Sequence, residues 1–343
     1  MANFRVKRYD DAGVFKQIHE TIQGAIDAAD SDDIIKVAAE TYSGGISISK
    51  SLTLSGPNAG IAGYEDRIDE AVLENSKISV SGASTVVVDG LHFHQTNDTQ
   101  DVILLGGSAI VTVQNCIIER NGEAAGKTAR GITTSSGIGE KIIKNNLFTG
   151  DDTGGLFSGH KTWNSGVYIN GAGSTVNIEG NIFENCRTAA NLDDFCNGIT
   201  LSGNTFSNNG THISFGGTSP TDGVYQLGAN DFNMPGSAIV NLSNVALSFR
   251  LDITSSTFAG SPFSELTTEE LLGIETAIYH RGRSNRNGLV TYVADTQFVV
   301  SVNPGIQAAV DAANPGDTIF VGPGSYPSEE TLQIDKGLIL EGV

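Results

Sequence analysis

The feature that most constrains the fold is a repeat in which an aromatic residue or Ile returns every 23 to 35 residues. The residue five positions before each anchor is apolar. The residue seven positions before each anchor is also apolar, except at Lys141, and the residue six positions before is mostly polar. The anchors are Phe93, Ile118, Phe148, Phe183, Phe206, Phe232 and Phe258. Such alternation is typical of a short strand that turns one face inward. The sequence therefore predicts the same inward-facing strand seven times over.

A second column of the repeat lies two residues before the anchors, where four consecutive repeats carry Asn. These are Asn146, Asn181, Asn204 and Asn230. Asn tolerates turn conformations, and we expect the stacked side chains to hydrogen-bond along the axis. An antiparallel sandwich would explain the strands but not the register of this column. A short unit that buries little alone and stacks on its neighbours is a solenoid, so we predict an all-β parallel β-helix.

The opening of the chain resembles the pectin-lyase-like right-handed parallel β-helix superfamily. The residues that carry the resemblance are Thr21-Ile22-Gln23, Asp27-Ala28-Ala29, Asp33 to Val37, Tyr42, Ile48, Lys50, Leu52, Leu54 and Gly56. The resemblance covers roughly residues 20 to 260 and implies a right-handed solenoid closed by a short amphipathic helix. The superfamily holds lyases, hydrolases, epimerases, phage spikes and surface proteins, so the resemblance implies a fold and not an activity.

This opening occurs twice, since residues 306–326 repeat residues 22–42, and residues 334–342 repeat residues 48–56. Between the copies, Thr267 to Glu270 form a capping box that precedes a helical pattern. We divide the chain into an N-terminal extension (1–20), a parallel β-helix (21–262), a helix-strand cap or linker (263–300) and the opening of a second β-helix unit (301–343). The last segment is expected to be a truncated piece of a tandem array or, as the alternative, to dock elsewhere.

Composition excludes several partners. The chain has 20 Lys and Arg against 39 Asp and Glu, a net charge of −19, whereas nucleic-acid binding depends on basic residues that neutralise phosphates. No apolar stretch is long enough to insert into a membrane, and three cysteines form no disulfide framework.

The N-terminus lacks the apolar segment of a signal peptide. Because tandem β-helix units resemble secreted bacterial surface proteins and adhesins, we still expect an extracellular or cell-surface location, with neighbouring copies of the unit.

The candidate site lies on the outer face of the strands that follow the longest coils, because long loops on a rigid scaffold usually carry function. Val167 and Ile169 are expected to point inward, which turns their neighbours outward. The same alternation in adjacent coils predicts one face made of Thr133, Tyr168, Asn170, Asn191, Asp193, His212 and Ser214. Such a face suits a polysaccharide, and we assign substrate binding to Trp163, Asn170, Asn191, His212 and Ser214.

Catalysis on an acidic glycan would need a base beside the uronate carboxylate and a cation to stabilise the developing charge. The candidate catalytic residues are Lys161, Arg187, His160 and Tyr168. The candidate ligands of a possible Ca²⁺ are Asp151, Asp152, Asp193 and Asp194. A hydrolase fits poorly, because the paired aspartates precede Gly159-His160-Lys161 by only eight residues instead of one coil. His92 and His94 are expected to face outward, without an evident third metal ligand.

Two functions follow. The first is a non-catalytic extracellular module of a tandem surface or adhesin-like protein that contacts carbohydrate. The alternative is a polysaccharide lyase or epimerase that acts on acidic glycans with calcium. A phage or virion spike module, which would form a trimer, stays open as a third hypothesis.

Overall fold

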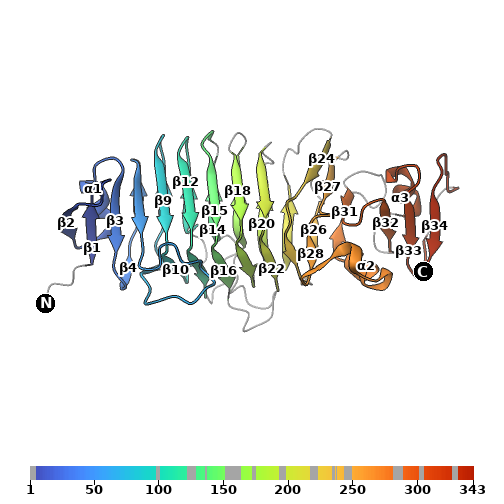
Figure 1. Cartoon of the computed structure of the whole chain (residues 1–343), viewed down its shortest axis with the longest axis horizontal. Coiled ribbons are helices and arrows are strands. Elements are labelled where there is room, and N and C mark those ends of the chain that lie inside the picture. The colour runs from blue at the N-terminus through green and yellow to red at the C-terminus, as the bar shows by residue number, and fades with distance from the viewer. Residues whose placement is uncertain are drawn as a thin grey trace.

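The structure, a computed structural model, describes residues 5–97, 101–121, 129–135, 137–150, 164–171, 175–192, 198–216, 223–233, 236, 238–242, 249–280, 289–300, 305–326 and 331–343. The chain folds as a long parallel β-helix, in which each turn of the chain contributes one strand to each of three sheets (Figure 1). The predicted all-β solenoid is confirmed.

The three long sheets run along the axis, and we name them A, B and C. Sheet A contains β2 (Phe15–His19), β1 (Val6–Tyr9), β3 (Asp33–Val37), β6 (Leu52–Ser55), β9 (Thr85–Asp89), β12 (Ile110–Gln114), β15 (Lys141–Lys144), β18 (Val176–Glu179) and β21 (Ile199–Ser202). Sheet B contains β4 (Thr41–Ser43), β7 (Val72–Glu74), β10 (His92–Gln95), β13 (Ile117–Arg120), β16 (Leu147–Gly150), β19 (Ile182–Glu184), β22 (Thr205–Ser207), β25 (Asp231–Phe232), β28 (Thr257–Phe258) and β29 (Ser261–Pro262). Sheet C contains β5 (Ile46–Ile48), β8 (Ile78–Val80), β11 (Ile103–Leu105), β14 (Arg130–Thr134), β17 (Ser165–Ile169), β20 (Thr188–Leu192), β23 (Thr211–Phe215), β26 (Ala238–Asn241) and β30 (Ile278–Tyr279).

Two small sheets complete the chain. Sheet D contains β24 (Gly223–Gln226), β27 (Phe249–Asp252) and β31 (Leu289–Thr291). Sheet E contains β32 (Thr296–Val299), β33 (Thr318–Val321) and β34 (Ile339–Gly342). The helical segments are α1 (Ile22–Ala28), a 3-10 turn (Phe263–Glu265), α2 (Thr268–Glu275) and α3 (Ile306–Ala312). No helix among the described residues combines the length and the apolar character needed to cross a lipid bilayer.

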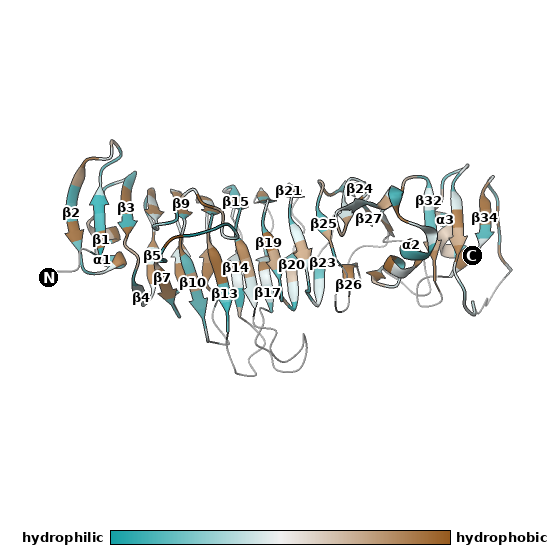
Figure 2. Cartoon of the chain, turned by 60° about the horizontal axis from the view of Figure 1, so that its bottom comes forward, coloured by the Kyte–Doolittle hydropathy of each residue, from teal (hydrophilic) through white to brown (hydrophobic). Residues whose placement is uncertain are grey.

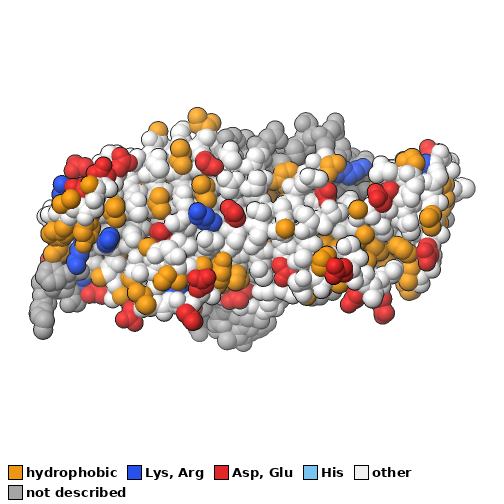
Figure 3. All heavy atoms as spheres, viewed as in Figure 1, with side chains coloured by type: hydrophobic (Ala, Val, Ile, Leu, Met, Phe, Trp, Pro, Cys, Tyr) orange, Lys and Arg blue, Asp and Glu red, His pale blue; other side chains and the backbone are white. Residues whose placement is uncertain are grey.

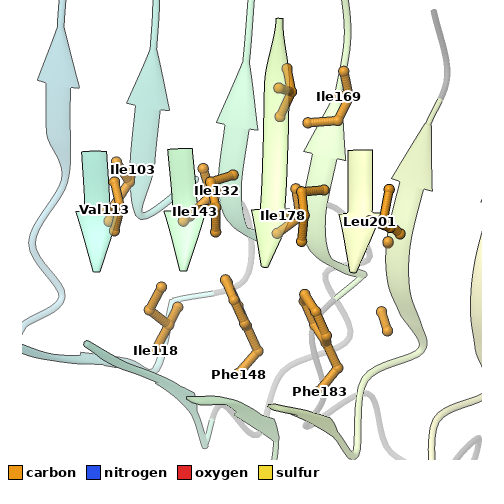
Figure 4. Close-up of a cluster of buried hydrophobic side chains, with 14 of the residues drawn as sticks. Ile103, Val113, Ile118, Ile132, Ile143, Phe148, Ile169, Ile178, Phe183 and Leu201 are labelled. Atoms are coloured by element: carbon orange, nitrogen blue, oxygen red, sulfur yellow. The ribbon is translucent and has the colours of Figure 1, made fainter. Parts of the chain in front are cut away.

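The predicted anchors form one continuous column inside the solenoid. Register pairs them strand by strand along sheet B. The rings of Phe148, Phe183 and Phe206 stack with centroids 4.6 and 5.2 Å apart, and Phe206 continues onto Phe232 at 5.3 Å. Figure 4 shows the column lying across the interior from the inward side chains of sheet A. Parallel in-register stacking therefore gives sheet B a largely aromatic inner wall, which packs against the aliphatic side chains of the other sheets.

Lys141, the exception in the sequence pattern, also points inward. It is fully buried on β15, and its ammonium donates to the backbone carbonyls of Ala109 and Gly139, the latter at 3.1 Å. Burial lowers the pKa of Lys141. The strand alternation places this polar side chain inside the solenoid, and its burial is tolerated because two turn carbonyls accept hydrogen bonds from the ammonium group.

The predicted asparagine ladder is confirmed. The Asn146 amide donates to Asn181 Oδ1 at 2.9 Å, Asn181 donates to Asn204 at 3.0 Å, and Asn204 donates to Asn230 at 2.9 Å. Each of the four side chains is buried and also donates to a carbonyl of an adjacent strand. The ladder thus satisfies the polar groups of the tight turn between sheets A and B.

The second opening packs onto the end of the first β-helix. The capping box of α2 is formed as predicted, with the Thr267 side chain accepting from the Glu270 backbone at 3.3 Å and the Glu270 carboxylate accepting from the Thr267 backbone at 2.8 Å. Past α2, the Tyr292 ring stacks on Phe298 at 5.2 Å, and Phe298 stacks on Phe320 of β33 at 5.6 Å. Strands of sheets C and D extend to β30 and β31, beyond residue 262.

Candidate functional site

The candidate site is a row of outward side chains on sheet C. Strand register places Thr133 beside Tyr168, Tyr168 beside Asn191, and Asn191 beside Ser214. Asn241 continues the row on β26. Figure 2 shows β14, β17, β20 and β23 side by side. The predicted registration of these coils is therefore confirmed, and we call the row Thr133, Tyr168, Asn191, Ser214 and Asn241 the sheet C face.

An arginine that the sequence analysis missed belongs to this face. Arg130 begins β14, two residues before the inward Ile132, and its guanidinium carbon lies 3.6 Å from the centroid of the Tyr168 ring. A cation held over an aromatic face in this way is attracted by the ring quadrupole. Tyr168 is only 7% exposed, so the pair forms a packed and positively charged centre on the row. Strict alternation from the inward Ile132 would turn Arg130 inward as well, so the sequence pattern gave no signal for this residue.

Three buried polar atoms near this pair have no hydrogen-bond partner among the described residues. They are Arg130 Nε, Thr133 Oγ1 and Ser165 Oγ, and Ser165 pairs with Arg130 in the strand register. Native proteins leave few buried polar atoms without a partner, because each costs about 1–3 kcal/mol. One donor and two hydroxyl groups beside the Arg130–Tyr168 pair therefore have hydrogen-bonding capacity that the described residues do not use.

The prediction that His212 lies on this outer face is wrong. His212 is fully buried, between the rings of Phe206 and Phe232 at 5.7 and 6.0 Å. Its Nε2 donates to the Asn233 carbonyl at 2.7 Å, and its Nδ1 accepts from the Asn209 amide at 3.2 Å. Burial lowers the pKa of His212 to about 4, so the ring is neutral at pH 7.

The cause of this error is a break in the alternation at the start of each strand of sheet C, where the chain bends in from sheet B. The two residues at this corner are both buried in successive coils. In three coils the residue at this corner is small, namely Gly131, Gly166 and Ala189. In the fourth coil it is His212, whose ring fills the inward space at the corner. A period-2 pattern cannot reveal such a corner.

The remaining predicted site residues divide into two groups. Asn170 and Arg187 are exposed and lie at the two ends of the strands of sheet C, Asn170 just after β17 and Arg187 just before β20. The others lie outside the described residues: Asp151, Asp152, His160, Lys161, Trp163, Asp193 and Asp194. All four predicted calcium ligands are in this second group, and the described residues contain no group of three His, Cys, Asp or Glu side chains that could hold a metal ion.

His92 and His94 face outward on sheet B, as predicted, and each binds a different carboxylate. His92 Nε2 lies 2.7 Å from Glu119 Oε2, and His94 Nδ1 lies 2.6 Å from Glu74 Oε2. The hydrogen bond from His92 lowers the pKa of Glu119. The two histidines thus contact neighbouring coils, with ring centroids 6.4 Å apart.

In a comparison with known families, residues 75–233 match the family described as Right handed beta helix region. The match includes four of the five residues of the sheet C face. No curated protein matches the chain.

Proposed function

We propose that this chain, a right-handed parallel β-helix, is a non-catalytic extracellular module that binds carbohydrate through the sheet C face. The observation that carries the proposal is the row itself. Each successive coil from β14 to β26 presents one hydroxyl, phenol or amide group in register. Because neighbouring strands lie about 4.8 Å apart, the row is a ladder of hydrogen-bonding groups along the solenoid axis.

The chemistry of the row suits a sugar chain laid along the axis. Sugar hydroxyls both donate and accept hydrogen bonds, and the Asn191 and Asn241 amides and the Ser214 and Thr133 hydroxyls can do both in return. The unpartnered Thr133 Oγ1 and Arg130 Nε lie beside Tyr168 at one end of the row. Arg130 and the exposed Arg187 bring positive charge to this edge of an acidic chain, which favours an anionic sugar over a neutral one.

Binding without turnover is the simplest function of these groups, because amide and aliphatic hydroxyl side chains do not titrate near neutral pH. The duplicated opening supports a place in a tandem array, since both copies repeat a hydrogen bond of the cap. Gln23 and Asp27 of α1 hydrogen-bond at 2.7 Å, and Gln307 and Asp311 of α3 do so at 2.8 Å. Because tandem units of this kind resemble secreted surface proteins, the duplication supports the proposal of an extracellular location.

A second candidate, a polysaccharide lyase, is favoured by one observation. Arg130 is held against Tyr168 on the face that would bind the sugar, and both residue types can take part in proton transfer next to a uronate carboxylate. The same experiment separates the two functions.

The test is calorimetric titration of the protein with a panel of neutral and acidic oligosaccharides. We expect an acidic oligosaccharide to bind, and Asn191→Ala or Arg130→Gln to weaken it about tenfold, the loss of one good hydrogen bond. Thr200→Ala, an exposed threonine on the outer face of sheet A, is the matched control and should bind as the wild type does. Equal binding by all variants would place the site elsewhere. Growth of ultraviolet absorbance from unsaturated uronate ends would establish the lyase instead.

A further inference from the structure

The row of outward side chains on sheet C extends past Asn241, because β30 adds one more strand to the sheet. Strand register places Asn241 beside Tyr279. Ile278, the residue before Tyr279, is fully buried, whereas Tyr279 is 39% exposed. The alternation of β30 therefore turns the Tyr279 side chain to the outer side of the sheet. One tyrosine, Tyr168, thus lies towards one end of the row, and a second lies at the other end.

The backbone on both sides of Tyr279 is held in place. The Tyr279 carbonyl accepts from the Leu242 backbone amide at 2.8 Å. The next residue, His280, donates through Nε2 to the buried Glu275 carboxylate at 2.9 Å, and its Nδ1 accepts from the Val290 backbone amide at 3.2 Å. Because β30 is fixed before a ligand arrives, binding at Tyr279 orders little additional backbone. The ring is therefore a preformed aromatic surface at the end of the row.

Positive charge lies at the other end of the row. Arg130 begins β14 and Arg187 directly precedes β20, whereas β23, β26 and β30 contain neither Lys nor Arg. The three residues of the row between the two tyrosines carry neutral amide or hydroxyl groups. Figure 3 shows acidic side chains spread over the visible face of the molecule and basic ones sparse among them, in keeping with the net charge of −19. Along the described part of the row, an anionic group is therefore attracted at the Arg130 end and not at the Tyr279 end.

Tyr279 can bind the flat face of a sugar ring. The C–H groups on one face of a pyranose form an apolar surface, whose burial against an aromatic ring is favourable. Their partial positive charge is also attracted by the negative face of the aromatic ring. The four strand spacings from Tyr168 to Tyr279 span about 19 Å, because neighbouring strands lie about 4.8 Å apart. An extended sugar chain advances by roughly one strand spacing per ring, so about four or five rings are needed to reach both tyrosines.

We propose that Tyr279 is a ring-binding residue of the site on sheet C, and that the site selects a chain of at least about four sugar rings with an anionic group at one end only. The inference rests on the proposed carbohydrate binding and adds the length and the charge pattern of the ligand. The charged end of the chain lies at Arg130, the neutral rings follow the amide and hydroxyl groups of the row, and the last ring packs on Tyr279. A shorter chain reaches one end of the row and binds more weakly.

The test is calorimetric titration of the whole chain with three series of β-1,4-linked glucose oligosaccharides of two to six rings. One series is neutral, one carries a single glucuronate at the non-reducing end, and one consists of glucuronate alone. We expect the singly charged series to bind most tightly, with an affinity that rises at least about tenfold between two and five rings. At five rings the fully charged chain should bind at least about tenfold more weakly than the singly charged chain.

Substitutions at Tyr279 separate ring packing from an effect on the fold. Tyr279→Ala should weaken binding of the five-ring, singly charged chain about tenfold and leave the two-ring chain unchanged. Tyr279→Phe keeps the aromatic ring and should bind as the wild type does. Tyr64→Ala is the matched control, because Tyr64 is 40% exposed and donates to the Gly180 carbonyl at the turn between sheets A and B. This variant should also bind as the wild type does.

The outcomes distinguish this inference from the proposed function. Binding of the five-ring chain that Asn191→Ala weakens and Tyr279→Ala does not would overturn the role of Tyr279 and leave the proposed function standing. An affinity that is the same at two and five rings, or is highest for the fully charged series, would overturn the length or the charge pattern. If no series binds, the proposed function and this inference are both wrong.

Discussion

Gln23 and Gln307 stand 284 positions apart and make the same hydrogen bonds. Gln23 Oε1 accepts from the Ser47 backbone at 2.8 Å, and Gln307 Oε1 accepts from the Gln333 backbone at 2.7 Å. Each amide nitrogen also donates to the carbonyl of the same backbone residue, at 3.3 and 3.0 Å. Two lysines repeat the pattern, since Lys50 donates to the Ala29 carbonyl at 2.7 Å and Lys336 to the Ala313 carbonyl at 2.8 Å. The duplicated sequence therefore repeats these glutamine and lysine hydrogen bonds at both caps, although Thr21 caps α1 with its side chain and the equivalent residue before α3 is Gly305.

The equivalence predicts matched effects at the two caps. Gln23→Ala and Gln307→Ala each remove two hydrogen bonds that hold a backbone segment against a helix, which should lower local stability by about 1–2 kcal/mol. Hydrogen exchange should speed up at the Ser47 amide in the first variant and at the Gln333 amide in the second. Each variant serves as the control for the other, because the cap with its glutamine intact should exchange at the wild-type rate. Faster exchange at both caps in either variant would contradict independent caps.

Breaking the asparagine ladder should destabilise the solenoid strongly. Asn181 is buried, donates to Asn204 Oδ1 and to the Ile143 carbonyl, and accepts from both the backbone and the side chain of Asn146. Asn181→Ala leaves these groups without partners in the interior, and we expect a loss of about 2–4 kcal/mol in urea unfolding. Asn177→Ala, on the outer face of sheet A, is the matched control and should cost less than about 1 kcal/mol. A ladder variant as stable as this control would show that the ladder is dispensable.

The buried His212 predicts a specific loss of stability in mild acid. Its folded-state pKa is about 4, below the ordinary value of 6.5, so between these values the unfolded chain binds a proton that the folded chain does not. Stability therefore falls as the pH drops through this window, by about 2 kcal/mol between pH 7.5 and pH 5.

Urea unfolding of wild type and His212→Gln at both pH values isolates this contribution, because the other five histidines are common to both chains. The variant should lose about 2 kcal/mol less than the wild type on acidification. Equal losses would show that His212 accepts a proton in the folded state.

Two glycines should respond oppositely to a methyl group. A Cβ on Gly131 would lie 2.5 Å from the Gly166 carbonyl oxygen and 3.2 Å from Phe148, so Gly131→Ala should destabilise the protein by about 1–3 kcal/mol. Gly273 lies inside α2 with open space around the same position. Gly273→Ala should therefore stabilise the protein by about 0.5–1 kcal/mol through helix propensity. Thermal unfolding of both variants measures the two signs, and a stable Gly131→Ala would mean that the corner can widen.

Much of the fold could be predicted because the repeat puts equivalent residues in register. The Phe column, the asparagine ladder and the row from Thr133 to Ser214 all follow from alternation within a strand and stacking between coils. Parallel in-register pairing stacks equivalent residues of successive coils on one another. A wrong prediction for one coil therefore leaves the predictions for the other coils unchanged.

The sequence by itself determined the solenoid, its inward face and its duplicated cap, because these depend on local periodicity and on nearest-neighbour coils. Tertiary structure decided what happens where the chain turns between sheets. At these turns His212 packs in the core between the rings of Phe206 and Phe232, and the Arg130 guanidinium packs on the Tyr168 ring. Only the packed solenoid sets the volume of a corner, and only the stacking of separate coils brings a guanidinium over a ring 38 positions away in the chain. Such contacts depend on space between coils, which residue spacing does not encode.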